Sequence, residues 1–175
     1  QFELYQCLSH QSRCQADPGK AMQWLKMAEQ NGEPRAKLQL VRSLMDAEGK
    51  NLQTVRQSLE ALIESNHLPA LILYAKLLAT SDDPQVKNLE QAIKYAQQAM
   101  ALDNNHPQLL WVLAVAHYEL GQTQQAQDFL VEAIREAEYR RWPIDLYVNT
   151  LEQYQRETLL GEKAQSEKVK EENSN

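Results

Sequence analysis

The feature that most constrains the fold is a repeat in the middle of the chain. Ala92 and Ala99 recur as Ala126 and Ala133, and each step is 34 residues long. A repeat of this length is typical of stacked helical hairpins, because each hairpin can bury its apolar side only against its neighbours. The spacing therefore predicts a helical solenoid with a thin, shared core.

The same frame extends toward the N-terminus. Apolar or small residues recur again after 34 residues, with Ala21, Ala28 and Ala36 matched by Val55, Leu62 and Ala70. Proline marks expected helix starts and glycine marks expected helix ends. The starts are Pro18, Pro34, Pro69, Pro107 and Pro143, and the ends are Gly32, Gly49, Gly121 and Gly161. We predict an all-α solenoid of about four antiparallel hairpins, the first one truncated, plus a C-terminal capping helix.

Two stretches resemble known repeat families. Residues 19–36 (GKAMQWLKMAEQNGEPRA) look like the second half of a Sel1-like repeat, with Glu29 in place of one of its paired alanines. Residues 107–137 resemble a tetratricopeptide repeat, although Leu110 stands where that family usually has Trp and His117 where it usually has Tyr. Its signature positions are filled by Leu113, Ala114, Gly121, Ala126, Leu130 and Ala133. The resemblance covers about residues 1–139 and implies a right-handed superhelix of helix pairs.

The composition limits the classes of partner that the chain can be expected to bind. The net charge is −6 and the longest basic cluster is Arg140-Arg141, so the chain lacks the basic face that nucleic acid requires. No apolar run approaches the roughly 18 residues needed to cross a membrane. Residues 161–175 are mostly charged, so we divide the chain into a repeat domain at 1–160 and a disordered tail at 161–175.

No pattern of residues predicts catalysis. The four histidines are scattered, and HExxH, GxSxG and P-loop motifs are missing from the sequence. We therefore expect no catalytic residues, no metal and no cofactor, and we predict that the chain is not an enzyme.

The two cysteines, Cys7 and Cys14, flank the first expected loop. A hairpin turn between them would bring them within disulfide reach and would imply an oxidising compartment. Some Sel1-like proteins carry disulfides between neighbouring helices, and this resemblance favours the bridge slightly. Two unpaired thiols in a cytosolic protein remain the alternative.

The resemblance also implies that the first helix of each hairpin lines an inner groove. The groove residues expected from the repeat frame are Leu38, Arg42, Met45, Ile72, Lys76, Trp111, Val115 and Tyr118. They form an apolar strip edged by two cations, which suits an extended segment or a partner helix. The alternative is that Trp111, Val115 and Tyr118 simply pack beneath the last helix.

These features favour a non-catalytic protein–protein interaction scaffold that binds a protein or peptide in the groove. The chain starts at Gln1 rather than Met, so we expect it to be a fragment of a larger protein. The Gln-rich, aromatic-poor helices and the Sel1-like portion favour a bacterial origin slightly. A periplasmic or otherwise exported location is favoured slightly over a cytoplasmic one. The alternative function is a structural or regulatory module attached to an enzyme or to an envelope transport or secretion apparatus. The last helix caps the solenoid or, alternatively, forms a homodimer.

Overall fold

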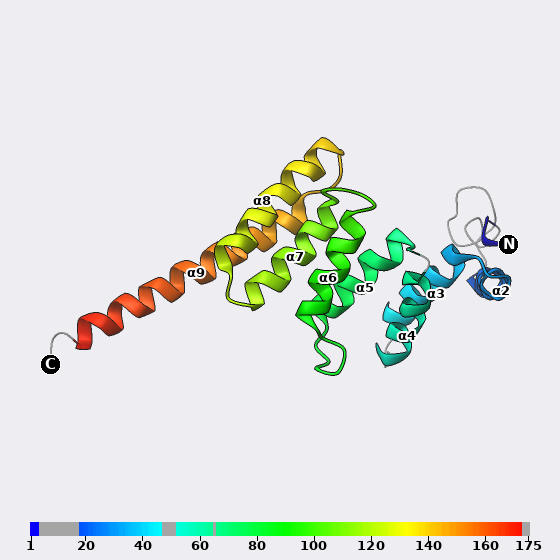
Figure 1. Cartoon of the computed structure of the whole chain (residues 1–175), viewed down its shortest axis with the longest axis horizontal. Helices are drawn as coiled ribbons and strands as arrows, with labels where there is room; N and C mark the ends of the chain where they lie inside the picture. Colours follow the sequence, from blue (N-terminus) through cyan, green and yellow to red (C-terminus); the bar gives the residue numbers. More distant parts are fainter. Residues whose placement is uncertain (4–17, 47–51, 65, 173–175) are drawn as a thin grey trace. The chain divides into compact units, whose positions relative to one another are not determined.

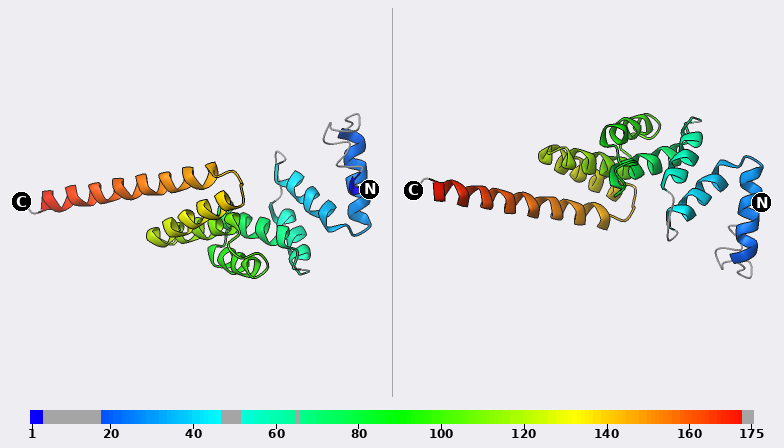
Figure 2. Two further views of the ribbon diagram at one scale, coloured as in Figure 1. Left: turned by 90° about the horizontal axis from the view of Figure 1, so that it is seen from above. Right: turned by 90° about the horizontal axis from the view of Figure 1, so that it is seen from below.

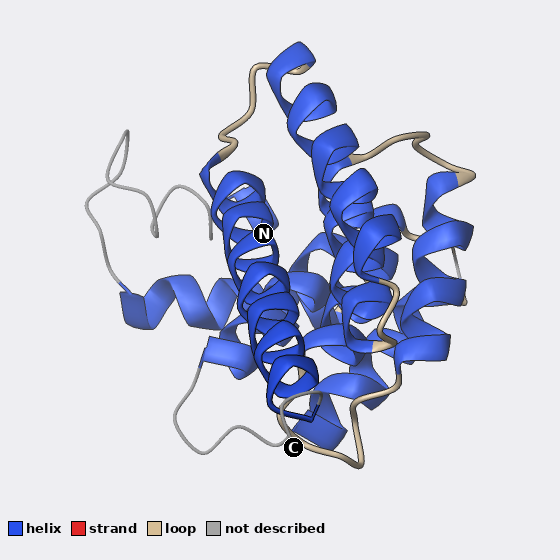
Figure 3. Cartoon of the chain, turned by 90° about the vertical axis from the view of Figure 1, so that its left-hand side faces the viewer, coloured by secondary structure: helices blue, strands red, loops and turns tan. Residues whose placement is uncertain are grey.

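The structure is a computed structural model that describes residues 1–3, 18–46, 52–64 and 66–172. These residues form eight helices and no strand (Figures 1 and 3). The helices are α2 (Pro18–Gln30), α3 (Pro34–Asp46), α4 (Leu52–Ile63), α5 (Leu68–Thr80), α6 (Leu89–Met100), α7 (Pro107–Glu119), α8 (Thr123–Tyr139) and α9 (Asp145–Glu172). The predicted all-α helical repeat fold is confirmed.

The chain divides into two compact units. Unit 1 contains residues 1–74 and 82–86, and unit 2 contains residues 75–81 and 87–175. Helix α5 contributes its first half to unit 1 and its second half to unit 2. Each unit is described by itself below.

Unit 1 is built on the hairpin of α2 and α3, with α4 packed against α3. Leu25, Ala28 and Ala36 are buried between α2 and α3, and Phe2 and Leu40 pack against them. Gly32 turns the chain between the two helices with φ +80°, a conformation that a side chain would strain. The proline and glycine signals therefore placed this hairpin correctly.

A polar contact in unit 1 joins α4 to α5. The Tyr74 hydroxyl donates a 2.8 Å hydrogen bond to Glu60, which also pairs with Arg56 at 2.9 Å. Burial, followed by this hydrogen bond, raises the pKa of Tyr74 to about 12. The bonds from Arg56 and Tyr74 lower the pKa of Glu60. The ionised form of the Glu60 carboxylate is thus favoured, because it accepts hydrogen bonds from both donors.

Unit 2 contains helices α6 to α9, and the buried sides of α6 and α8 are lined by alanine. Alanines of α6 and α8 are fully buried, and they are Ala92, Ala96, Ala99, Ala126, Ala133 and Ala137. Small side chains allow neighbouring helix backbones to approach closely, so the alanines that repeat every seven residues form the seams of the stack. Helix α7 lies between α6 and α8 and is buried on most sides.

The last helix differs from its prediction. Helix α9 begins at Asp145, not at Pro143, and it continues through Gly161 to Glu172. The predicted helix end at Gly161 is therefore wrong. Gly161 does not adopt the positive φ of Gly32 and Gly121, and a helical glycine costs only about 1 kcal/mol relative to alanine. The residues that follow are mostly good helix formers, and the helix continues through them. The division into a domain at 1–160 and a tail remains a prediction.

Helix α9 has two parts with different surroundings. Its first part packs against α8, whereas its second part extends beyond α7 and α8 without another helix beside it (Figures 1 and 2). Leu159 and Leu160 on this helix are 58% and 61% exposed. No described helix is both long and apolar enough to cross a bilayer.

Candidate protein-binding surface

The predicted groove residues are distributed over both units. In unit 1, Leu38 is buried, Arg42 is exposed, and Met45 and Ile72 are half-buried. In unit 2, Lys76 is exposed, Val115 is buried, and Trp111 and Tyr118 are half-buried. The contacts of the residues in unit 2 define a surface on α7, described next.

Trp111 is held between α5 and α9. Its indole Nε1 donates a 3.1 Å hydrogen bond to Thr150 Oγ1, and the Lys76 ammonium lies 5.6 Å from the ring centroid. Thr150 in turn donates to the backbone carbonyl of Leu146 at 2.7 Å. That second bond fixes the hydroxyl proton, so the oxygen lone pair is left to accept from the indole.

Tyr118 lies two turns further along α7 and contacts α9 in two ways. Its ring stacks on Tyr154, with centroids 3.6 Å apart and planes 3° from parallel. Its hydroxyl donates to a carboxylate oxygen of Glu157, and Gln153 donates to the other oxygen at 2.9 Å. The bond to Glu157 raises the pKa of Tyr118 to about 12, and the same bond lowers the pKa of Glu157.

We call Trp111, Val115 and Tyr118 of α7, together with Lys76 of α5, the α7 face. The structure places α9 against this face, since Thr150, Tyr154 and Glu157 contact it. The arrangement corresponds to the alternative in which these side chains pack beneath the last helix. Partner binding by the predicted groove residues stays a prediction, as does a homodimer through the C-terminal helix.

A second polar cluster, which the sequence did not reveal, joins two turns of unit 2. Arg140 makes two 2.9 Å hydrogen bonds to the Asp103 carboxylate and a third, at 3.1 Å, to the carbonyl of Asn104. Its guanidinium also lies 5.4 Å from the Trp142 ring centroid. Arg140 lowers the pKa of Asp103, chiefly through the hydrogen bonds. The partners are 37 residues apart, so no local pattern links them.

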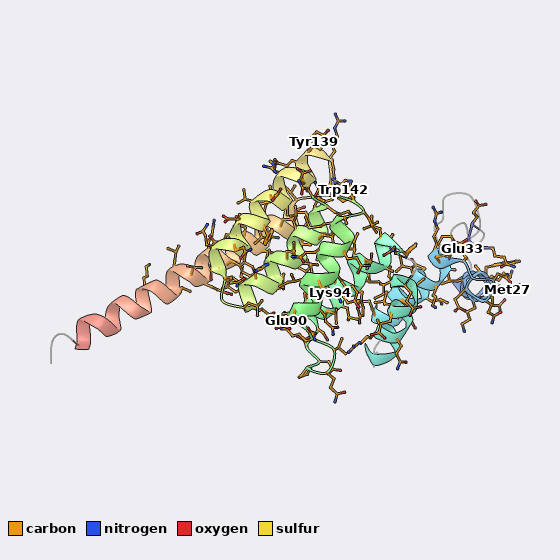
Figure 4. The ribbon with its side chains drawn as sticks, viewed as in Figure 1. Met27, Glu33, Glu90, Lys94, Tyr139 and Trp142 are labelled. Carbon is orange, nitrogen blue, oxygen red and sulfur yellow. The ribbon has the colours of Figure 1, made fainter. Side chains whose placement is uncertain are left out.

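His106 completes this cluster. Its ring lies 5.2 Å from that of Trp142, and its buried Nδ1 has no hydrogen-bond partner. Burial lowers the pKa of His106, so the neutral form is favoured. Trp142 is 42% exposed, and Tyr139 at the end of α8 is 85% exposed (Figure 4).

The described residues contain no group of three His, Cys, Asp or Glu side chains placed to hold a metal ion. Cys7 and Cys14 lie outside the described residues, so the predicted disulfide remains a prediction. The ring centroid of His117 lies 5.3 Å from that of Phe129, and its Nδ1 forms a hydrogen bond with Gln122.

Comparison with known proteins supports the repeat. The tetratricopeptide repeat family model matches residues 85–138, a range that contains α6 and α7 and nearly all of α8. No curated protein and no solved structure matches the chain. In residues 85–138 the chain is thus similar to tetratricopeptide repeats, which are in general protein–protein interaction modules. The Sel1-like character of the earlier repeats remains a prediction.

Proposed function

We propose that the chain is a non-catalytic scaffold that binds a protein partner through the inner positions of its repeat helices. The observation that carries this proposal is the tetratricopeptide match over residues 85–138, together with the aromatic and cationic side chains on the α7 face. Aromatic residues are enriched among the side chains that contribute most to protein binding. The parent of this chain would be a larger, bacterial protein.

Charge suggests what the partner offers. Arg42 and Lys76 are exposed side chains at two of the predicted inner positions, on two different helices, and neither forms an ion pair with another described residue. Cations at the rim of a binding surface mainly set the association rate and the choice of partner. We therefore propose that the partner carries carboxylates, which Arg42 in unit 1 and Lys76 in unit 2 would each attract.

The test is a pull-down with charge-reversed variants. The tagged chain, intact or carrying Arg42→Glu and Lys76→Glu, is exposed to an extract of the cells that produce it, and captured proteins are quantified by mass spectrometry. Lys94→Glu is the matched control, because Lys94 is also exposed but lies on α6, a second helix of its hairpin (Figure 4). Loss of a captured protein in the double variant alone is expected. Equal capture by all three chains would remove the inner positions from the proposal.

A structural module is the second candidate, and one observation favours it. Helix α9 already covers Trp111 and Tyr118, so this part of the inner surface has an occupant within the chain. Such a module would hold an attached enzyme or transport apparatus in position without a groove ligand. Cross-linking of the full-length parent distinguishes the two candidate functions. A structural module would give cross-links from the outer helices to neighbouring domains, whereas a scaffold with a groove ligand would give cross-links from Lys76 to a separate protein.

A further inference from the structure

We propose that α9 acts as a built-in ligand of the α7 face, and that the partner accepted there is an α-helix of the same chemistry. That helix presents a hydroxyl, an aromatic ring and a carboxylate at the spacing of Thr150, Tyr154 and Glu157. This inference rests on the proposed scaffold function and names the kind of partner that the scaffold binds.

The polar contacts all run in one direction. The α7 face supplies donors, which are the indole N–H of Trp111 and the hydroxyl of Tyr118, and Lys76 adds a positive charge beside the indole. Helix α9 supplies the acceptors, which are the hydroxyl of Thr150 and the carboxylate of Glu157. A ligand helix with a cation in place of Glu157 would leave Tyr118 without its acceptor and would add a second positive charge to this surface.

The spacing requires a helix. Trp111 and Tyr118 are seven residues apart on α7, and their partners Thr150 and Glu157 are also seven apart on α9. Seven residues are two turns of an α-helix, so both pairs lie on facing stripes, and the two helices run in the same direction. Tyr154 falls between them on the same stripe and stacks on Tyr118. An extended peptide would place the residue at position 157 on the side opposite to those at 150 and 154, and its rise per residue is about twice that of a helix, so it could not match the three contacts.

Helix α9 contacts unit 2 with one side of its first part. On that side Tyr147 and Tyr154 are buried in the core, while Leu146, Glu152 and Arg156 are exposed. The chain enters α9 through a connection of five residues between Tyr139 and Asp145. A tethered helix has an effective concentration in the millimolar range, so α9 lowers the apparent affinity of a separate helix without excluding it.

The experiment uses a synthetic, fluorescently labelled peptide of residues 144–163 and the full chain. Fluorescence anisotropy measures peptide binding to the unaltered chain and to the Tyr154→Ala variant, whose own α9 has lost its stacking contact. We expect the variant to bind the peptide at least about tenfold more tightly, because its own α9 competes less for the α7 face. The stacking and ring burial that α9 loses are together worth more than the free energy of a tenfold change in affinity. Leu159→Ala is the matched control, since Leu159 is exposed on the same helix, and it should bind like the unaltered chain.

A second peptide tests the chemistry of the ligand. The peptide that carries Glu157→Lys should bind the Tyr154→Ala chain about two- to fivefold more weakly than the unaltered peptide, since a solvent-exposed hydrogen bond to a carboxylate is lost. Should Tyr154→Ala reduce the helical circular dichroism of the whole chain, the Glu157→Lys chain replaces it, because this exposed side chain is not part of the core.

The outcomes decide between the possibilities. A helical variant that binds no peptide, equal binding by the unaltered and variant chains, or equal binding of both peptides would each overturn the built-in ligand. None of these results depends on the pull-down with Arg42 and Lys76, so the scaffold function can survive when this inference fails. If the double variant loses specific capture in that pull-down and peptide binding is as expected, the results support both the scaffold function and the built-in ligand.

Discussion

Replacing Arg141 by glycine should stabilise the protein. Arg141 follows α8 and adopts φ +59°, in the left-handed region. Its N–H bonds to the carbonyl of Glu138, and the N–H of Trp142 bonds to the carbonyl of Ala137. This pair of bonds is the Schellman arrangement that ends many helices, and its left-handed position is usually glycine. The chain follows that rule at Gly121, with φ +78°.

The expected gain is the difference of two opposing effects. A residue with a side chain pays about 1–2 kcal/mol for the left-handed conformation, and glycine removes this cost. Glycine also makes the unfolded chain more flexible, which costs about 0.4–1 kcal/mol. The net stabilisation by Arg141→Gly is therefore about 0.5–1 kcal/mol. The exposed side chain of Arg141 makes no hydrogen bond or ion pair given by the structure, so little else changes.

Urea unfolding followed by far-ultraviolet circular dichroism measures this gain. With a slope of about 2 kcal/mol per molar urea, the midpoint should rise by about 0.3–0.5 M. Gly121→Ala is the reciprocal change and should lower stability by a similar amount, since the added Cβ would meet no atom within 4 Å and only the backbone is strained. A midpoint that does not rise in Arg141→Gly, while Gly121→Ala falls as expected, would refute the assigned strain at Arg141.

Three further predictions follow from the fold of unit 2. Gly161→Ala should increase helical circular dichroism at 222 nm, because the added methyl meets no atom and alanine favours the helix by about 1 kcal/mol; an unchanged signal would contradict a helix through this residue. Asp103 has a lowered pKa, so its contribution to stability is complete above its ordinary pKa near 3.8 and is lost as pH falls through the lowered value. In urea titrations, the difference in stability between the unaltered chain and Asp103→Asn should therefore shrink between pH 7 and pH 3. A constant difference would contradict a stabilising contact between Asp103 and Arg140. Leu130→Ala should lower the unfolding free energy by about 2–5 kcal/mol, since the side chain is fully buried, and a loss below 1 kcal/mol in calorimetry would contradict this packing.

Local signals predicted the helices and most of their ends. Pro34 and Pro107 begin helices as expected. Gly32 and Gly121 occupy the left-handed positions that follow α2 and α7. These residues act through their own backbone geometry, so their effect can be read from sequence. Gly161 shows the limit of this reasoning, because glycine permits a helix end but does not require one.

The contacts of the candidate surface were less predictable. The repeat frame identified Trp111 and Tyr118 as inner positions, but it gave no information on how α9 would lie over them. Their partners Thr150 and Glu157 are each 39 residues away, and the pairing depends on how two helices pack. The Arg140 contact with Asp103 has the same origin. Such contacts follow from tertiary packing, which local patterns do not encode.

The positions of the three tryptophans have a spectroscopic consequence. Trp24 lies on α2 in unit 1, Trp111 contacts α9, and Trp142 lies in the connection between α8 and α9. Chains that retain a single indole, with the other two changed to phenylalanine, would report separately on unit 1, on the seating of α9 and on the connection that leads into it. Emission from Trp111 alone would thus follow the release of α9 in real time, without an attached dye.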